Sequence, residues 1–381
     1  MKISHYIIFF IVVFTVYFIG NLYLFLKGYN IIPRSGKLLY TIAFIFLAAI
    51  FIVAKILESR HSTLFSDVLN IAGGFWLAFL LYTFIFFLFS DILFLILRLT
   101  GLLHPEAIPL YRKWAFILTV TISSLFIIGG FINAVIPVVK EYDISVAKQT
   151  DDVKNLRIAA VSDIHLGSII RKRSIIKLSE VLEKMQPDAV FLLGDIIDGE
   201  LGPVLRGDLL KYFHGPHTRD GLYAITGNHE YIGGGDRTIP YIESKGIRIL
   251  KDEMVVLPGG IQVAGRLDRD SFRYSGKNRM PLEELLENTD HSRPVILLDH
   301  QPLNLGEAEK NGIDLQLSGH THKGQLWPLN HLIDRIYEVG HGYKKKGNTH
   351  IIVSSGYGLW GPRVRTSGRP EVLQINIKFT D

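Results

Sequence analysis

The chain has 381 residues, enough for two domains, and 48% of them are hydrophobic, a high share for a water-soluble protein. Residues 1–140 hold ten of the 41 basic and four of the 36 acidic residues, so the remainder, with 31 and 32, is nearly neutral despite the overall charge of +5. This balance offers no basic surface for nucleic acid, and we expect no nucleic-acid partner. The absence of cysteine excludes disulfides, thiolate nucleophiles and cysteine-ligated zinc.

Four long apolar stretches in residues 1–140 predict an all-α transmembrane bundle of four helices. They lie at Tyr6–Leu26, Leu38–Ala54, Val68–Ser90 and Ala115–Val139. Each is long enough to cross a hydrocarbon core of about 30 Å. A buried helical core is the alternative, and uninterrupted apolar runs of this length disfavour it. No small-residue cleavage pattern follows the first stretch, so we expect it to be retained rather than removed as a signal peptide.

The Lys and Arg residues around these stretches predict the orientation in the membrane. Four spans place both chain ends on one side. Six cations lie in the loops 27–37 and 98–113, namely Lys27, Arg34, Lys37, Arg98, Arg112 and Lys113, and five lie on the other side, namely Lys2, Lys55, Arg60, Lys140 and Lys148. Cytoplasmic loops carry the excess of Lys and Arg, so we expect the C-terminal domain outside the cytoplasm of a bacterial cell.

Ionisable residues within the apolar stretches would indicate transport. Lys55, Asp91 and Arg98 all lie near span ends, and the sequence shows no charge pair inside the membrane. The four helices are therefore expected to anchor the protein, or to shape an entry path for a lipid substrate.

Beyond a polar connector at residues 141–155, short apolar runs alternate with amphipathic stretches. In residues 174–185, for example, apolar side chains recur at helical spacing on one face. Apolar runs buried on both faces and interleaved with helices predict an α/β domain with a central sheet, partly antiparallel near the C-terminus. We therefore divide the chain into a transmembrane region (1–140), the connector and a globular domain (156–381).

Five apolar runs of the globular domain end in side chains that can bind metal. These are Asp163 and His165 after residues 157–161, Asp195 after 189–193, Asn228 and His229 after 222–226, His300 after 295–298, and His320 with His322 after 315–317. Ligands gather beyond the carboxyl ends of strands in α/β sheets, so these side chains should converge. Singly, each has a structural explanation, such as a helix cap, a turn residue or a buried histidine. Together, nitrogen and oxygen ligands without sulfur predict a site for two divalent ions such as Mn, Fe or Zn.

The order of these residues resembles that of the calcineurin-like metallophosphoesterases. That family's motifs D-x-H, G-D-x-x-D, G-N-H-[ED], a lone His and G-H-x-H are matched by Asp163-Ile-His165, Gly194-Asp195-Ile-Ile-Asp198, Gly227-Asn-His-Glu230, His300 and Gly319-His-Thr-His322. The longer GHTHKGQ and the late GYGLWGPR are similar to the membrane-associated bacterial branch related to YkuE and YaeI. The resemblance covers about residues 155–379 and leaves the four predicted spans outside.

The resemblance implies a layered β-sandwich flanked by helices, two divalent metal ions and a role for each matched residue. Asp163, His165 and His322 would hold one ion, Asn228, His300 and His320 the second, and Asp195 would bridge them. His229 would face the substrate phosphoryl group, where it can protonate the departing oxygen or stabilise equatorial charge. Asp198 is better placed to support Asn228 or His229 than to bind metal.

Four cations are candidates for contact with substrate phosphate. Lys323 stands where members of the family usually have Gly, and it either contacts phosphate or points to solvent. Arg266, Arg273 and Lys277 follow the apolar run 261–264 and could bind a second phosphate, with a solvated surface loop as the alternative.

We therefore expect a membrane-embedded phosphoric ester hydrolase in which a metal-bridging hydroxide attacks a phosphodiester or pyrophosphate. A phosphorylated small molecule or a lipid-linked compound would be its substrate, and no protein partner can be inferred. One alternative is a pyrophosphatase acting on a nucleotide-linked acylated sugar. Another is a transporter or receptor whose globular part is an inactive, regulatory metal-binding module. The complete ligand set favours an enzyme.

Overall fold

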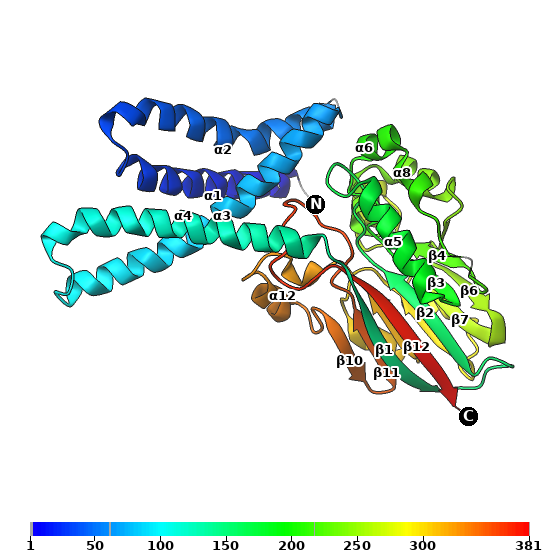
Figure 1. Ribbon diagram of the computed structural model, residues 1–381. Helices are drawn as coiled ribbons and strands as arrows, with labels where there is room; N and C mark the ends of the chain where they lie inside the picture. The colour runs from blue at the N-terminus through cyan, green and yellow to red at the C-terminus, as the bar shows by residue number, and fades with distance from the viewer. Residues whose placement is uncertain (1–2, 61, 217, 381) are drawn as a thin grey trace. The chain divides into compact units, whose positions relative to one another are not determined.

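The computed structural model describes residues 3–60, 62–216 and 218–380, so Lys2, which was counted in predicting the orientation, lies outside them. The chain divides into two compact units (Figure 1). One comprises Met1–Ile132 with Gly361–Val364, and the other comprises Asn133–Trp360 with Arg365–Asp381.

Four long helices build the first unit. They are α1 Ile3–Tyr29, α2 Lys37–Arg60, α3 Leu64–Leu99 and α4 Ile108–Ala134, with the short 3-10 turns η1 Arg34–Gly36 and η2 Pro105–Ala107 between them. All four are long and apolar enough to cross a membrane by length and composition, which confirms the four predicted apolar helices. The longest, α3, begins at a capping box in which Thr63 and Ser66 bond each other's backbone N–H.

The interior of this helical unit is aromatic and contains one feature that the sequence did not reveal. Phe44, Trp76 and Phe87 belong to its buried core. Lys27 of α1 forms an ion pair with Asp91 of α3, close to the ends of both helices. The two residues are 64 positions apart in the chain, and only the packing of α1 on α3 brings them together.

Two six-stranded sheets build the second unit. The first, in the order β1-β12-β2-β3-β4-β5, contains β1 Val138–Ala147, β2 Asn155–Val161, β3 Ala189–Leu193, β4 Leu222–Ile225, β5 Arg248–Ile249 and β12 Glu371–Thr380. The second, in the order β10-β11-β9-β8-β7-β6, contains β6 Glu253–Leu257, β7 Ile261–Gly265, β8 Val295–Leu298, β9 Leu315–Ser318, β10 Gly342–Lys346 and β11 Thr349–Val353. One core draws on both sheets, with Phe191 and Ile375 from the first and Ile296 and Leu315 from the second. This confirms the predicted layered β-sandwich.

Helices connect and flank these sheets (Figure 1). They are α5 Lys172–Met185, α6 Leu201–Gly207, α7 Asn228–Ile232, α8 Gly235–Glu243, α9 Ser271–Ser275, α10 Leu282–Leu285, α11 Leu305–Lys310 and α12 Asn330–Ile336. Strands β2 to β5 are parallel, as are β7, β8, β9 and β11, while β12 runs antiparallel to β2. Each parallel set therefore brings its carboxyl ends to one edge, which is where metal-binding side chains were predicted.

The segment predicted as a connector, residues 141–155, differs from that expectation. Its first half belongs to β1, which pairs with β12 over ten residues at the edge of the first sheet. Only Ile144 and Val146 of its central part are buried, and polar residues stand between and before them. An edge strand with one apolar face therefore reads as a polar segment in the sequence.

Candidate metal centre

Strand ends supply every predicted metal-binding residue. Asp163 and His165 follow β2, Asp195 follows β3, Asn228 begins α7 directly after β4, His300 follows β8, and His320 and His322 follow β9. Five of these residues have positive φ, from 49° at His322 to 70° at His320. Non-glycine residues pay for this conformation with about 1–3 kcal/mol each, and such residues cluster at functional sites.

Glycines at the strand ends allow the turns to approach one another closely. A Cβ atom on Gly319 would lie 1.6 Å from Ser162 Oγ, and one on Gly227 would lie 2.1 Å from Asp195 Oδ1. An added Cβ would displace Asp195 itself in one case and, in the other, Ser162, whose Oγ donates to Asp163 Oδ2. Glycine at both motif positions is thus a steric requirement of the centre.

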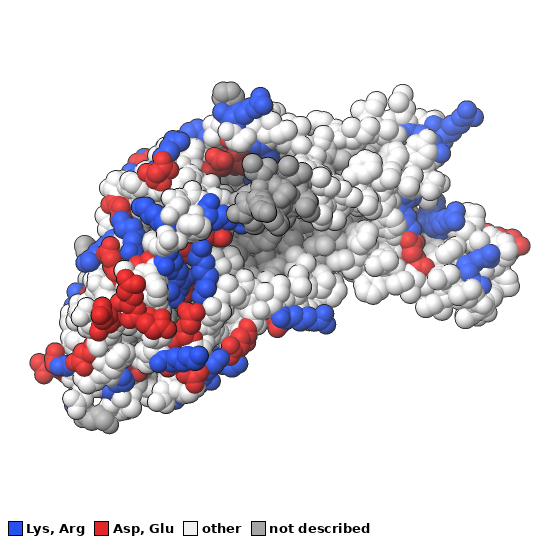
Figure 2. Space-filling model, turned by 180° about the vertical axis from the view of Figure 1, so that it is seen from behind, with Lys and Arg blue, Asp and Glu red and all other residues white. Residues whose placement is uncertain are grey.

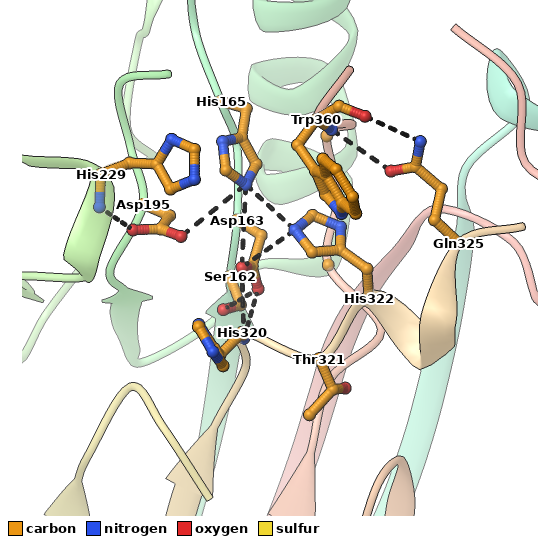
Figure 3. Close-up of polar contacts among 12 residues, drawn as sticks. Ser162, Asp163, His165, Asp195, His229, His320, Thr321, His322, Gln325 and Trp360 are labelled. Atoms are coloured by element: carbon orange, nitrogen blue, oxygen red, sulfur yellow. Dashed lines mark hydrogen bonds and ion pairs between the residues drawn. The ribbon is translucent and has the colours of Figure 1, made fainter. Parts of the chain in front are cut away.

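Three overlapping groups of side chains bring their ligand atoms within 4.8 Å of one another. The groups are Asp163 with His165 and His322, His165 with Asp195 and His229, and Asp195 with His300 and His320. Figure 3 shows most of these side chains turned toward a common space.

The distances within these groups suit metal coordination. His322 Nε2 lies 3.0 Å from His165 Nε2 and 3.3 Å from Asp163 Oδ1, and His300 Nε2 lies 3.2 Å from Asp195 Oδ2. Ligand atoms bound at roughly 2.0–2.2 Å to one ion stand about 3–4 Å apart. The observed spacings therefore match those expected around shared divalent ions.

The buried atoms that have no hydrogen-bond partner among the described residues include two at this centre, His300 Nε2 and Asn228 Oδ1. Leaving such an atom unpaired costs about 1–3 kcal/mol. His300 Nδ1 lies 2.7 Å from the Leu193 carbonyl oxygen, so the neutral ring would donate there and carry its lone pair on Nε2. Both atoms are thus available to a cation, and the mixed oxygen and nitrogen donor set fits Mn, Fe or Zn.

The electrostatics among these side chains favour charged carboxylates and two neutral imidazoles. Burial would raise the pKa of Asp195, but nearby histidines, foremost His300, hold the pKa of Asp195 well below its usual range. Burial lowers the pKa of His320 and of His322 to about 4. At neutral pH these two rings are therefore uncharged and able to bind metal.

His229 differs from its neighbours in charge and exposure. Burial would lower the pKa of His229, but the charge of Asp195 and the hydrogen bond that His229 donates to Asp198 together raise it to about 9. A quarter of its side chain (25%) is exposed, compared with 1% for His165 and none for His300. His229 is thus a cation at neutral pH on the open side of the centre.

Asp198 supports two histidines at once. Its Oδ1 lies 3.1 Å from His165 Nδ1 and 3.2 Å from His229 Nδ1. Contact with His229 was one of the two possibilities inferred from the sequence, and contact with His165 was not foreseen. The carboxylate orients both rings through the nitrogen that faces away from the centre.

Two further residues contribute to the centre although sequence reasoning gave them no role. Glu230 is fully buried and accepts hydrogen bonds from the backbone N–H groups of Asp195, Ile197 and Gly227 at 2.8–3.0 Å. Arg365, also fully buried, donates to the Ser355 carbonyl oxygen and lies 3.2 Å from His322 Nδ1. Glu230 stands inside the G-N-H-[ED] motif, whereas no pattern in the sequence marks Arg365.

A cavity of about 280 Å³ opens onto these side chains. Part of its lining is polar and includes Asn228, His229 and His320. The rest is largely apolar and consists mainly of Leu329, Leu332, Ile333, Tyr337 and Trp360. Gln325 fixes the Trp360 backbone with two hydrogen bonds, to its carbonyl oxygen at 2.9 Å and from its N–H at 3.2 Å (Figure 3).

None of the four predicted phosphate-binding cations is among the described residues that line this cavity. Arg266 is buried, and its guanidinium lies 3.6 Å from Asp299 and 3.4 Å from Glu307. The guanidinium of Arg273 lies over the ring of Tyr274. Contact of these two residues, of Lys277 and of Lys323 with substrate stays a prediction.

Comparison with known proteins assigns the family. Residues 156–324 match the family of calcineurin-like phosphoesterases. An uncharacterized metallophosphoesterase of Aquifex aeolicus is 33% identical over 63% of this chain and 91% of its own length. An uncharacterized metallophosphoesterase of Campylobacter jejuni is 28% identical over 98% of this chain and 99% of its own, so that match includes the helical unit.

Two more distant relatives concern the apolar helices and the predicted similarity to the YkuE branch of the family. A protein of Danio rerio named transmembrane protein with metallophosphoesterase domain is 28% identical over 69% of this chain and 62% of its own length. YkuE of Bacillus subtilis is 25% identical over 59% of this chain and 80% of its own, which confirms the predicted similarity to that branch. With its apolar helices and its clustered aspartates and histidines, the chain belongs to the calcineurin-like metallophosphoesterases, a family of metal-dependent phosphoric ester hydrolases.

Proposed function

We propose that the protein is a membrane-embedded hydrolase that uses two divalent ions to cleave a phosphodiester or pyrophosphate in a lipid-linked substrate. The observation that carries this proposal is the cavity, whose lining combines the predicted metal-binding side chains with five largely apolar ones.

The three overlapping groups support the assignment of ligands to two ions. Asp163, His165 and His322 would hold one ion, Asn228, His300 and His320 the other, and Asp195, which belongs to two of the groups, would lie between them. When bound, such ions lower the pKa of water and so supply hydroxide near neutral pH.

His229 would contact the phosphoryl group of the substrate, although it lies close enough to His165 and Asp195 to bind a metal ion with them. It is the histidine of the second group that is exposed to the cavity, and it is protonated at neutral pH. It can therefore donate a proton to the departing oxygen, while Asp198 keeps its ring oriented.

The apolar part of the lining supports a substrate with an acyl or prenyl group. None of the described side chains of α12 is buried, and Leu332 and Ile336 are 54% and 58% exposed. Exposed apolar side chains beside an active-site cavity are typical of a surface that binds an apolar group. Together with the four apolar helices, this favours a substrate taken from the membrane.

Hydrolysis by purified full-length protein tests the proposal. With Mn²⁺ it should hydrolyse bis-p-nitrophenyl phosphate, and Asp195→Ala should abolish turnover. Asp208→Ala is the matched control, because Asp208 is an exposed carboxylate that pairs with Lys245. Retained turnover in Asp195→Ala would refute the bridging role.

The substrate class needs a separate comparison. A phosphodiester that carries acyl chains should be cleaved with a kcat/KM at least about tenfold above that of its deacylated counterpart, because chain burial stabilises the complex by about 0.8 kcal/mol per CH₂. Equal values would refute the lipid link while leaving the phosphoesterase chemistry intact. An acylated nucleotide diphosphate sugar should be assayed beside these two substrates, because its cleavage tests the alternative that the protein is a pyrophosphatase.

A further inference from the structure

The helical unit contains a second cavity, which the phosphoesterase reaction does not use. It has a volume of about 250 Å³ and is lined by the last turns of α1, the later part of α3 and the first turns of α4. Lys27, Asp91 and Arg112 are the charged residues of its lining, and the rest is mainly aromatic and aliphatic.

Hydrogen bonds within the cavity already satisfy its acidic group. Lys27 donates to Asp91 Oδ1, and the Tyr23 hydroxyl donates to Asp91 Oδ2 at 2.6 Å. On the facing side, the Tyr111 hydroxyl donates to the Ser90 carbonyl oxygen at 2.7 Å. The Asp91 carboxylate therefore already accepts from two donors and has no need of a bound cation.

Arg112, by contrast, has no carboxylate partner within residues 3–60, 62–216 and 218–380. Its guanidinium lies 5.9 Å from the ring centre of Phe94, and its side chain is exposed. Two cations against one anion give the cavity a net charge of +1. The cavity thus has an available guanidinium, which is suited to bidentate binding of phosphate.

The depth of these residues along the helices corresponds to a lipid headgroup region. Arg112 stands four residues after the start of α4, and Lys27 stands two residues before the end of α1. On the face of the helical unit that Figure 2 shows, charged residues gather toward the ends, and few lie between them. Tyrosines such as Tyr23 and Tyr111 favour this region of a bilayer.

We propose that this cavity binds the phosphate headgroup of an anionic membrane lipid. Arg112 pairs with the phosphate, Lys27 adds positive charge beside it, and Phe94 and Phe116 contact the first methylene groups of the lipid. This site is separate from the metal centre, and its occupancy does not depend on hydrolysis.

Binding of a fluorescent phosphatidic acid to full-length protein in phosphatidylcholine nanodiscs tests the proposal. Arg112→Gln should raise the Kd about tenfold or more, because a charge-assisted bidentate contact is lost. Arg34→Gln, which removes an exposed cation of the η1 turn outside the cavity, is the matched control and should leave the Kd unchanged. Equal effects of the two substitutions would refute a specific site.

Two further arms identify the ligand. Unlabelled phosphatidic acid should displace the probe, and glycerol 3-phosphate should not; equal competition would overturn the lipid in favour of a free phosphate. Asp91→Asn should tighten binding, because it removes a negative charge and releases Lys27, and weaker binding would instead show that Asp91 holds an ammonium group of the ligand. Each variant should keep the wild-type rate with bis-p-nitrophenyl phosphate, because the cavity is separate from the metal centre.

Discussion

The charge of His229 should control the protonation of the leaving group. Since the pKa of His229 is raised to about 9, the ring is a donor below that pH and loses its proton as the pH rises through it. Bound cations oppose the charge of Asp195, so we expect the alkaline limb of kcat/KM at or below about pH 9. A pH profile from 6 to 10 measures it, and His229→Gln should lack this limb.

The leaving group separates the two roles proposed for His229. An alkyl ester needs a proton on its departing oxygen, whereas p-nitrophenolate leaves without one. His229→Gln should therefore lower kcat by about 10²–10⁴-fold for an alkyl phosphodiester, and by far less for bis-p-nitrophenyl phosphate. An equal loss with both substrates would assign His229 to stabilising charge on the phosphoryl oxygens instead.

Asp198 should affect metal binding and proton transfer together, because it contacts both His165 and His229. Asp198→Asn should weaken metal affinity by about 10–100-fold. It should also move the alkaline limb to lower pH, since a negative charge that raises the pKa of His229 is removed. Metal titration and the pH profile measure the two effects, and a change in neither would leave Asp198 without a function in the centre.

At the level of elements, the close approach of the turns after β3 and β4 should not tolerate a methyl group. Gly227→Ala places Cβ 2.1 Å from Asp195 Oδ1, so metal binding should fall at least about tenfold and stability by about 1–3 kcal/mol. In Gly306→Ala, within α11, the nearest atom lies 3.9 Å from the new Cβ, and stability should rise by about 0.5–1 kcal/mol. Thermal unfolding and elemental analysis of the two variants measure their stability and metal content. Full metal content in Gly227→Ala would contradict the steric argument.

Helix α12 should determine affinity for the apolar part of the substrate. Leu332→Ser should raise KM for an acylated phosphodiester several-fold and leave kcat/KM for bis-p-nitrophenyl phosphate unchanged. Val256→Ser, at a somewhat more exposed position on β6, controls for a general loss of surface hydrophobicity. If the two substitutions raise KM alike, α12 has no specific part in binding.

Sequence patterns predicted the strands that are buried on both faces. They failed for a strand with one buried face and for contacts between residues that lie far apart in the sequence. The fully buried runs Ala189–Leu193 and Val295–Leu298 form β3 and β8 with the predicted bounds. The edge strand β1 was taken for a connector, since its polar face dominates its sequence. Arg365 has no motif, and its position beside His322 results from the packing of the C-terminal loop.

For the whole molecule, the side of the membrane that holds the metal centre is still a prediction. The chain has no cysteine, so single substitutions report accessibility without background. Asp152→Cys, exposed between β1 and β2, should react with an impermeant thiol reagent in intact cells, and Ser35→Cys in η1 should react only after permeabilisation. The reverse pattern would place the catalytic domain in the cytoplasm.

The content of bound metal tests the central claim most directly. Elemental analysis of purified full-length protein should find close to two divalent transition-metal ions per chain, and markedly fewer in Asp195→Asn, with hydrolysis falling in parallel. A folded protein that hydrolyses phosphodiesters with no bound ion, or an Asp195→Asn variant with the full metal content and rate, would contradict the account.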